Sequence, residues 1–219
     1  MIPRRAACSL LAVLAAIGTG CAAAPPSKDY SAFRAADPHS ILIVPPVNRS
    51  MDVRAPELVL TILPIPLAER GYYVFPVNMV KRVLEDEGLS DPNLVHGADA
   101  ARLCNLFGAD AALFATIEEW VVEQHGVDVR IFLEFDFALK DGKTGVTLWR
   151  EHRSAESRGG SADPMSSLLA NAILRSMPTG WTYVPLARKT VGEVFGDPRE
   201  GLPAGPHRKD YGKDASSGK

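Results

Sequence analysis

The sequence predicts an α/β fold: a single mixed sheet with an early parallel pair of strands, a long antiparallel hairpin, and helices packed on the sheet. Residues 41–44 form a short, wholly apolar run, which is typical of a strand buried on both faces. Residues 55–70 and 77–87 have helical character, and each stretch is followed directly by glycine. Every odd-numbered residue of 127–139 is apolar while the even ones are mostly charged, which indicates a long strand with one wet face.

The first half of the chain is expected to form a β-α-β unit. The strand at 41–44 stops at Pro45 and Pro46, which cannot continue a ladder. A helix follows, and Pro64 and Pro66 should kink it or divide it into two short helices. The aromatic and β-branched residues 72–75 predict a second strand. Two strands joined by a helix suggest a parallel pair.

The second half is expected to supply the antiparallel part of the sheet. The strand at 127–139 should be joined by the glycine-rich turn 141–145 to a partner strand at 146–153. The other predicted elements are a helix at 98–107, a strand at 111–122, a polar loop at 154–163 and a last helix at 164–177.

The amino terminus predicts export and lipidation. Arg4 and Arg5 precede an apolar stretch that ends in small residues before Cys21, a pattern typical of a signal peptide. The stretch is shorter than the roughly 20 residues that a membrane span needs. Thr19, Gly20 and Cys21 resemble a lipobox, although Gly18 stands where leucine is usual. The alternative is an ordinary secretory cut near Cys21 or after residues 22–24, which would leave a periplasmic protein without lipid.

These features divide the chain into a signal peptide at 1–20, a lipidated cysteine with its tether at 21–38, a mixed α/β domain at 39–195 and a disordered polar tail at 196–219. A formal net charge of −2 argues against a nucleic-acid partner. Cys8 would leave with the signal peptide and Cys21 would carry palmitate and other acyl chains. Cys104 is then alone, and its helical face with Leu103 and Phe107 predicts a buried, inert thiol.

Several segments resemble a family of conserved bacterial lipoproteins of unknown function. The similarity covers roughly residues 29–157, and it fades beyond Arg158. The segments that carry it are residues 29–35 (DYSAFRA), 40–48 (SILIVPPVN), 66–77 (PLAERGYYVFPV), 107–111 (FGADA) and 141–145 (DGKTG) with Leu148 and Trp149.

This resemblance implies an outer-membrane lipoprotein whose domain faces the periplasm. It implies a fold similar to the amino-terminal domain of TolB and to the curli-channel lipoprotein CsgG. It also implies an accessory role beside CsgG-like proteins in envelope assembly. No catalytic residues are implied by the family.

The residues themselves offer little that predicts chemistry. The chain lacks a nucleophile elbow, a His-Glu-x-x-His motif and a phosphate-binding glycine loop, so we expect no catalytic residues, no metal site and no cofactor. Two places are candidates for ligand or partner contacts. Pro45, Pro46, Asn48 and Arg49 follow the end of a central strand, where ligands of α/β sheets bind. Phe132 stands among charges on the wet face of the alternating strand.

Two classes of function remain open, and neither is enzymatic. The first is a lipid-anchored assembly or interaction protein that contacts other envelope proteins. The second is a carrier or binding protein for a small envelope ligand held in a pocket over the sheet. The long alternating strand needs pairing along its edges, so we also expect a homo-oligomer, most simply a two-fold dimer, formed through an edge strand or the face that bears Phe132.

Overall fold

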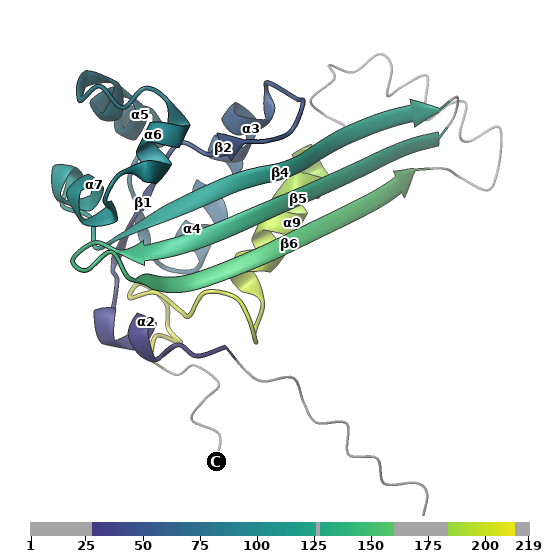
Figure 1. Ribbon diagram of the computed structural model, residues 1–219. Helices are drawn as coiled ribbons and strands as arrows, with labels where there is room; N and C mark the ends of the chain where they lie inside the picture. The colour runs from purple at the N-terminus through teal and green to yellow at the C-terminus, as the bar shows by residue number, and fades with distance from the viewer. Residues whose placement is uncertain (1–27, 126–127, 160–183, 213–219) are drawn as a thin grey trace, which may run out of the picture.

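The computed structural model describes residues 28–125, 128–159 and 184–212. Their strands form one mixed sheet in the order β3-β1-β4-β5-β6, with the short β2 also paired to β4 (Figure 1). β1 is parallel to both β3 and β4, and β2 is parallel to β4. β5 is antiparallel to both β4 and β6. The predicted fold class is therefore confirmed, including the early parallel pair of β1 and β3. The strands are β1 (Ser40–Ile43), β2 (Val47–Asn48), β3 (Tyr73–Val74), β4 (Ala111–His125), β5 (Asp128–Asp141) and β6 (Thr147–Gly159).

The helices begin and end largely where local sequence signals place them. Asp99 caps the last helix before β4 by accepting a hydrogen bond from the backbone N–H of Ala101, and Gly108 ends that helix with a positive φ. The prolines near residue 64 divide the first long helical stretch in two, as predicted. The helices are α2 (Ser31–Ala36), α3 (Ala55–Ile62), α4 (Pro64–Glu69), α5 (Val77–Asp86), α6 (Pro92–Gly97), α7 (Ala100–Phe107) and α9 (Val184–Gly196).

The parallel half of the sheet is buried on both faces. Ile41 and Ile43 belong to a core that includes residues of α3, α4 and α9, whereas Leu42 and Val44 belong to a second core with α5, α6 and α7. Helices thus cover both faces here, as the apolar run of β1 predicted. Cys104 lies in the second core and is 1% exposed, which confirms that it is a core residue.

The antiparallel half is covered on one face. Alternate residues of β5 enter the larger core, among them Ile131, Leu133, Phe135 and Phe137. The residues between them are exposed or half-buried, so the predicted wet face is confirmed. β6 continues to Gly159, well beyond the predicted end at residue 153. Residues 154–159 were wrongly predicted as loop because their polar composition hides a long edge strand that pairs with β5.

The carboxy-terminal part differs most from expectation. The helix α9 was not predicted, although it places Val191, Val194 and Phe195 in the larger core. The helix predicted at 164–177 lies outside the described residues. The segment after Gly196 was predicted to be disordered, and for residues 197–212 this is wrong because Leu202 is fully buried. Sequence reasoning judged this segment by its glycine, proline and charge content, which does not show what the backbone contacts.

Residues 197–212, which we call the C-terminal strap, bind the domain largely through backbone groups. Tyr72 donates its hydroxyl hydrogen to the Pro203 carbonyl at 2.7 Å, and Trp149 Nε1 donates to the Glu200 carbonyl at 2.8 Å. Tyr30 donates to the Gly201 carbonyl at 2.7 Å. Tyr30 and α2 fall in the predicted tether of 21–38, so the packed structure begins before residue 39. Figure 1 shows α2 and the strap together at one end of the molecule.

Candidate interaction surface

The end of β1 is a rigid turn. Pro46 is buried and Pro45 is half-buried, and the Pro45 carbonyl accepts a hydrogen bond from His96 Nε2 at 3.1 Å. The His96 ring meets the Phe114 ring edge to face, with centroids 5.2 Å apart. Burial lowers the pKa of His96, which favours the neutral ring. Pro45 and Pro46 therefore set the direction of the chain, and the polar groups around them are already paired.

Asn48 and Arg49 shape the loop that follows β2. Asn48 Oδ1 accepts hydrogen bonds from the backbone N–H and hydroxyl of Ser50 at 3.1 and 2.7 Å, and its amide donates to the Asp52 carbonyl at 2.9 Å. Arg49 donates from Nη1 to both carboxylate oxygens of Glu118 at 2.7 and 3.0 Å. The Arg49 backbone N–H also donates to the Ile117 carbonyl of β4 at 2.8 Å. Both predicted contact residues thus hold the loop in one conformation against the sheet.

This held loop carries two apolar side chains into solvent. Met51 is 96% exposed and Val53 is 86% exposed, while the next most exposed large apolar residue of the described chain, Leu94, is 57% exposed. Arg49 and Arg54 flank them, with side chains 64% and 56% exposed. We call residues 49–54 the apolar loop. The sequence analysis did not single out Met51 and Val53. Two large apolar residues between charged residues in a short loop could have identified them.

The second predicted contact residue, Phe132, lies at the centre of the open face of β4, β5 and β6. It pairs directly with Val121 of β4 and Glu156 of β6, and directly paired residues share a face. Phe132 and Val121 are both half-buried. They form a small apolar centre beyond the part of this face where Phe114 and Ala138 pack against the second core (Figure 1).

Carboxylates dominate the surroundings of this apolar centre. Register places Glu119, Glu123, Glu134 and Asp136 on the same face. Arg130 offsets part of this charge, because its Nε lies 2.9 Å from an oxygen of Glu156. We call the outward-facing residues of 119–123, 130–136 and 152–156 the sheet patch.

His152 joins two of these carboxylates. Its Nε2 lies 3.2 Å from Glu134 Oε1 and its Nδ1 lies 2.9 Å from Asp136 Oδ1. Both ring nitrogens are therefore engaged across β5 and β6, and the imidazole bridges two acids on an open surface. Among the described residues, no three histidine, cysteine or acidic side chains come together as ligands for a metal ion.

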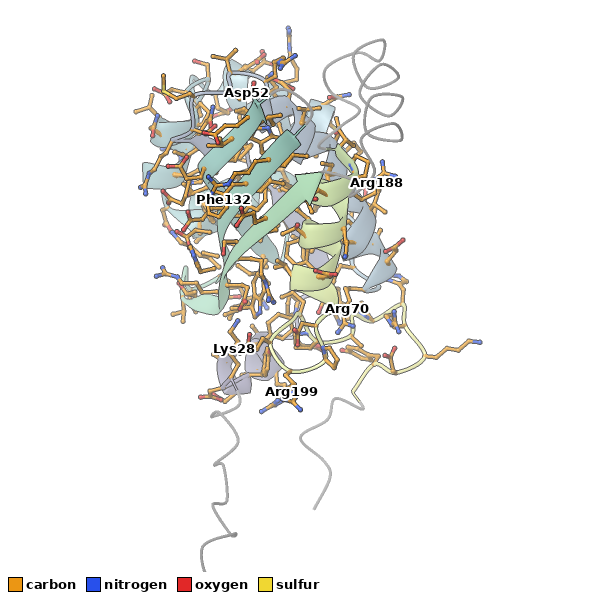
Figure 2. All side chains as sticks on the ribbon, turned by 90° about the vertical axis from the view of Figure 1, so that its right-hand side faces the viewer. Lys28, Asp52, Arg70, Phe132, Arg188 and Arg199 are labelled. Atoms are coloured by element: carbon orange, nitrogen blue, oxygen red, sulfur yellow. The ribbon has the colours of Figure 1, made fainter. Side chains whose placement is uncertain are left out.

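A bulge in β4 brings the apolar loop and the sheet patch side by side. The register with β5 shifts between Ile117 and Glu119, and Glu118 at the shift binds Arg49 of the loop. Glu119, the next residue, already belongs to the patch. The structure thus brings Arg49 near the face of Phe132. Pro45 and Pro46 instead direct the chain at the end of β1, where the Pro45 carbonyl contacts His96 of α6. Figure 2 shows Asp52 of the loop at the opposite end of the domain from Lys28, the first residue that the structure describes.

Comparison with known proteins identifies the family. Residues 28–179 match the family described as "Putative lipoprotein GNA1162-like". The chain belongs to this family. A curated relative of the GNA1162-like family from Neisseria meningitidis serogroup B is 36% identical over 144 residues, which is 66% of this chain and 66% of that relative, just under two thirds of its length.

The chain is also similar to solved structures. The crystal structure of lipoprotein GNA1162 from Neisseria meningitidis has 29% identity and a TM-score of 0.53, covering 63% of this chain and 96% of that one. The PelC dodecamer from Paraburkholderia phytofirmans has 14% identity and a TM-score of 0.46, covering 74% and 88%. In the described part of the chain, no helix has the length and apolar character that crossing a membrane requires. The predicted lipidation site, Cys21, lies outside the described residues.

Proposed function

We propose that this protein is a lipid-anchored accessory or assembly factor of the cell envelope. A lipid on Cys21 would hold it at the outer membrane, and the domain would work in the periplasm through contacts with other proteins. Membership of a lipoprotein family supports the anchor, as does the signal pattern that ends at Cys21. Ala22 follows the cysteine where aspartate would, by resemblance to other lipoproteins, favour retention at the inner membrane.

The sheet patch is the observation that carries this proposal. A β-sheet face with an apolar centre and a charged surround has the anatomy of a protein interface, in which a small apolar core is ringed by polar groups. Phe132, at the centre of the patch, lies away from Lys28, the first described residue after Cys21 (Figure 2). A tether at Cys21 would leave this face free to meet a partner beyond the membrane surface, such as a CsgG-like lipoprotein.

The test uses a photo-crosslinking amino acid at position 132 of the full-length protein in intact cells. We expect discrete protein adducts from position 132. The matched control is position 189, on the outer surface of α9, where the Lys189 side chain is 72% exposed. Adducts from 132 but not from 189 support the proposal, and mass spectrometry of the adduct would name the partner. A protein that reaches the membrane yet gives no adduct from 132 would contradict it.

A further inference from the structure

We propose that the apolar loop of one copy docks on the sheet patch of a second copy of this chain. This inference rests on the proposed function, because it names a partner for the same surface. Single exposed apolar residues are common on protein surfaces and need no explanation. The apolar loop is different, because its two apolar side chains are almost wholly exposed while its backbone is tied down.

The loop is preorganised for binding. Asp52 Oδ1 accepts a hydrogen bond from the Arg54 backbone N–H at 2.9 Å, and Asn48 bonds to both Ser50 and the Asp52 carbonyl. Arg49 fastens the loop to β4 through Glu118. Little backbone conformational entropy is therefore left to lose when Met51 and Val53 are covered, which favours association.

The sheet patch complements the loop in both apolarity and charge. Its apolar centre of Val121 and Phe132 offers a place for Met51 and Val53, since apolar side chains prefer to leave water together. Glu119 and Glu123 of the surround are exposed, and the apolar loop, with Arg49, Asp52 and Arg54, has a net charge of the opposite sign. Complementary charge around an apolar centre sets the register of an interface. The chain therefore carries both halves of one interface.

The position of the two surfaces allows both contacts to form at once. The loop and the patch adjoin at the β4 bulge, where Glu118 binds the loop and Glu119 belongs to the patch. A two-fold axis beside the bulge would place each loop on the patch of the other copy, which is the self-complementary arrangement of a two-fold dimer. Because the loop lies opposite Lys28 (Figure 2), the tethers of both copies would remain free to reach a membrane.

The test is cysteine crosslinking between two differently tagged full-length copies in one cell. One copy carries Met51→Cys and the other carries Phe132→Cys, and a short bis-maleimide links thiols that meet. Cys104 is buried and should not react. We expect a product that contains both tags. The matched control replaces Phe132→Cys by Arg82→Cys on α5, where the side chain is 76% exposed, and it should give no such product.

A charge exchange makes the test specific. Arg54→Glu in the loop copy or Glu119→Arg in the patch copy should each lower the yield on the order of tenfold, because like charges then face each other. The two changes together, one in each copy, should restore it. Glu119 is exposed, so its replacement should leave the fold intact, and normal abundance of each variant verifies this.

Three outcomes would overturn the inference. The 51/132 pair could give no more product than the 51/82 pair, or position 51 could link only to position 51 of another copy. Position 51 could instead link only to a different protein, in which case the proposed function would stand and self-association would fail. The proposed function fails separately when position 132 contacts no protein at all.

Discussion

Ser40 and Asp110 join the starts of β1 and β4 by hydrogen bonds that run in both directions. Asp110 Oδ2 accepts from the Ser40 backbone N–H at 2.9 Å and from its hydroxyl at 2.8 Å, while Ser40 Oγ accepts from the Asp110 backbone N–H at 3.0 Å. The His39 backbone N–H donates to the same carboxylate oxygen at 3.1 Å. This pair aligns the two central parallel strands at the end where both begin.

We expect Asp110→Asn to destabilise the fold by about 2 kcal/mol at neutral pH, since hydrogen bonds to a charged acceptor contribute about 1.5–3 kcal/mol. Burial by itself would raise the pKa of Asp110, but the hydrogen bonds from Ser40 and His39 outweigh it and hold the pKa below its ordinary 3.8. The carboxylate's contribution to the free energy of unfolding is therefore complete at pH values above the ordinary pKa. It is lost as the pH falls through the lower pKa of the folded protein.

Urea unfolding of the mature chain with Cys21→Ser, at neutral and acid pH, measures this effect. The stability difference between the parent and Asp110→Asn should shrink below the ordinary pKa. The control is Asp86→Asn, at a position whose side chain is 65% exposed. Equal stability of parent and Asp110→Asn at neutral pH would contradict the role given to this pair.

Cys21→Ser should abolish acylation and release the protein from the membrane fraction, because the acyl chains on Cys21 are the proposed anchor. Stable anchoring requires more than one acyl chain, and this substitution would remove all of them. Labelled palmitate should enter the parent and the Cys104→Ser control but not Cys21→Ser. On a sucrose gradient the parent should follow outer-membrane markers. Label in Cys21→Ser, or none in the parent, would rule out lipidation at this residue.

The Cys104 thiol should resist maleimide in the native protein and react after unfolding. Burial, followed by the charges of Asp141, Asp110 and Asp99, raises its pKa to about 12, so the reactive thiolate is scarce at neutral pH. Met51→Cys, at an exposed position, serves as the reactive control. Labelling of native Cys104 at the rate of that control would show that α7 leaves its place in the core.

Gly142→Ala should destabilise the fold by about 2 kcal/mol, within the range for overpacking. A Cβ at this position would lie 2.7 Å from the Asp110 carbonyl oxygen and 2.9 Å from Cys104 Cβ, so the β5–β6 turn would have to move away from α7. Gly97→Ala is the control, because no atom lies within 4 Å of the added carbon there. Thermal unfolding compares the two, and equal melting temperatures would disprove the close approach.

Leu202→Ala should lower the free energy of unfolding by about 3 kcal/mol, as expected for a leucine lost from a packed core. Leu202 of the C-terminal strap is fully buried, while the control residue Leu94 is 57% exposed. Removal of residues 213–219 should change little, whereas removal from Asp197 onward should destabilise the fold further. Full stability without residues 197–219 would mean that the strap does not hold the domain.

The local sequence determined much of this fold. The apolar run at 41–44 revealed a strand covered on both faces, and the alternation of 127–139 revealed which side of β5 meets the core. Prolines and glycines located several ends of the helices predicted between residues 55 and 107, since they act on the backbone within a few residues. Phe132 was identified as an outward residue for the same reason, because period-2 alternation distinguishes the two faces of a strand.

What the tertiary structure alone decided is which distant residues adjoin. The bulge at residues 117–119 and the register of β4 with β5 set Val121 against Phe132, and the Arg49–Glu118 pair brings the apolar loop beside them. The strap at 197–212 looked disordered because its packing depends on backbone carbonyls that accept from Tyr72 and Trp149. Periodicity reports how each segment divides between core and water, but neighbours across the surface follow from strand register and loop closure, which no local pattern encodes.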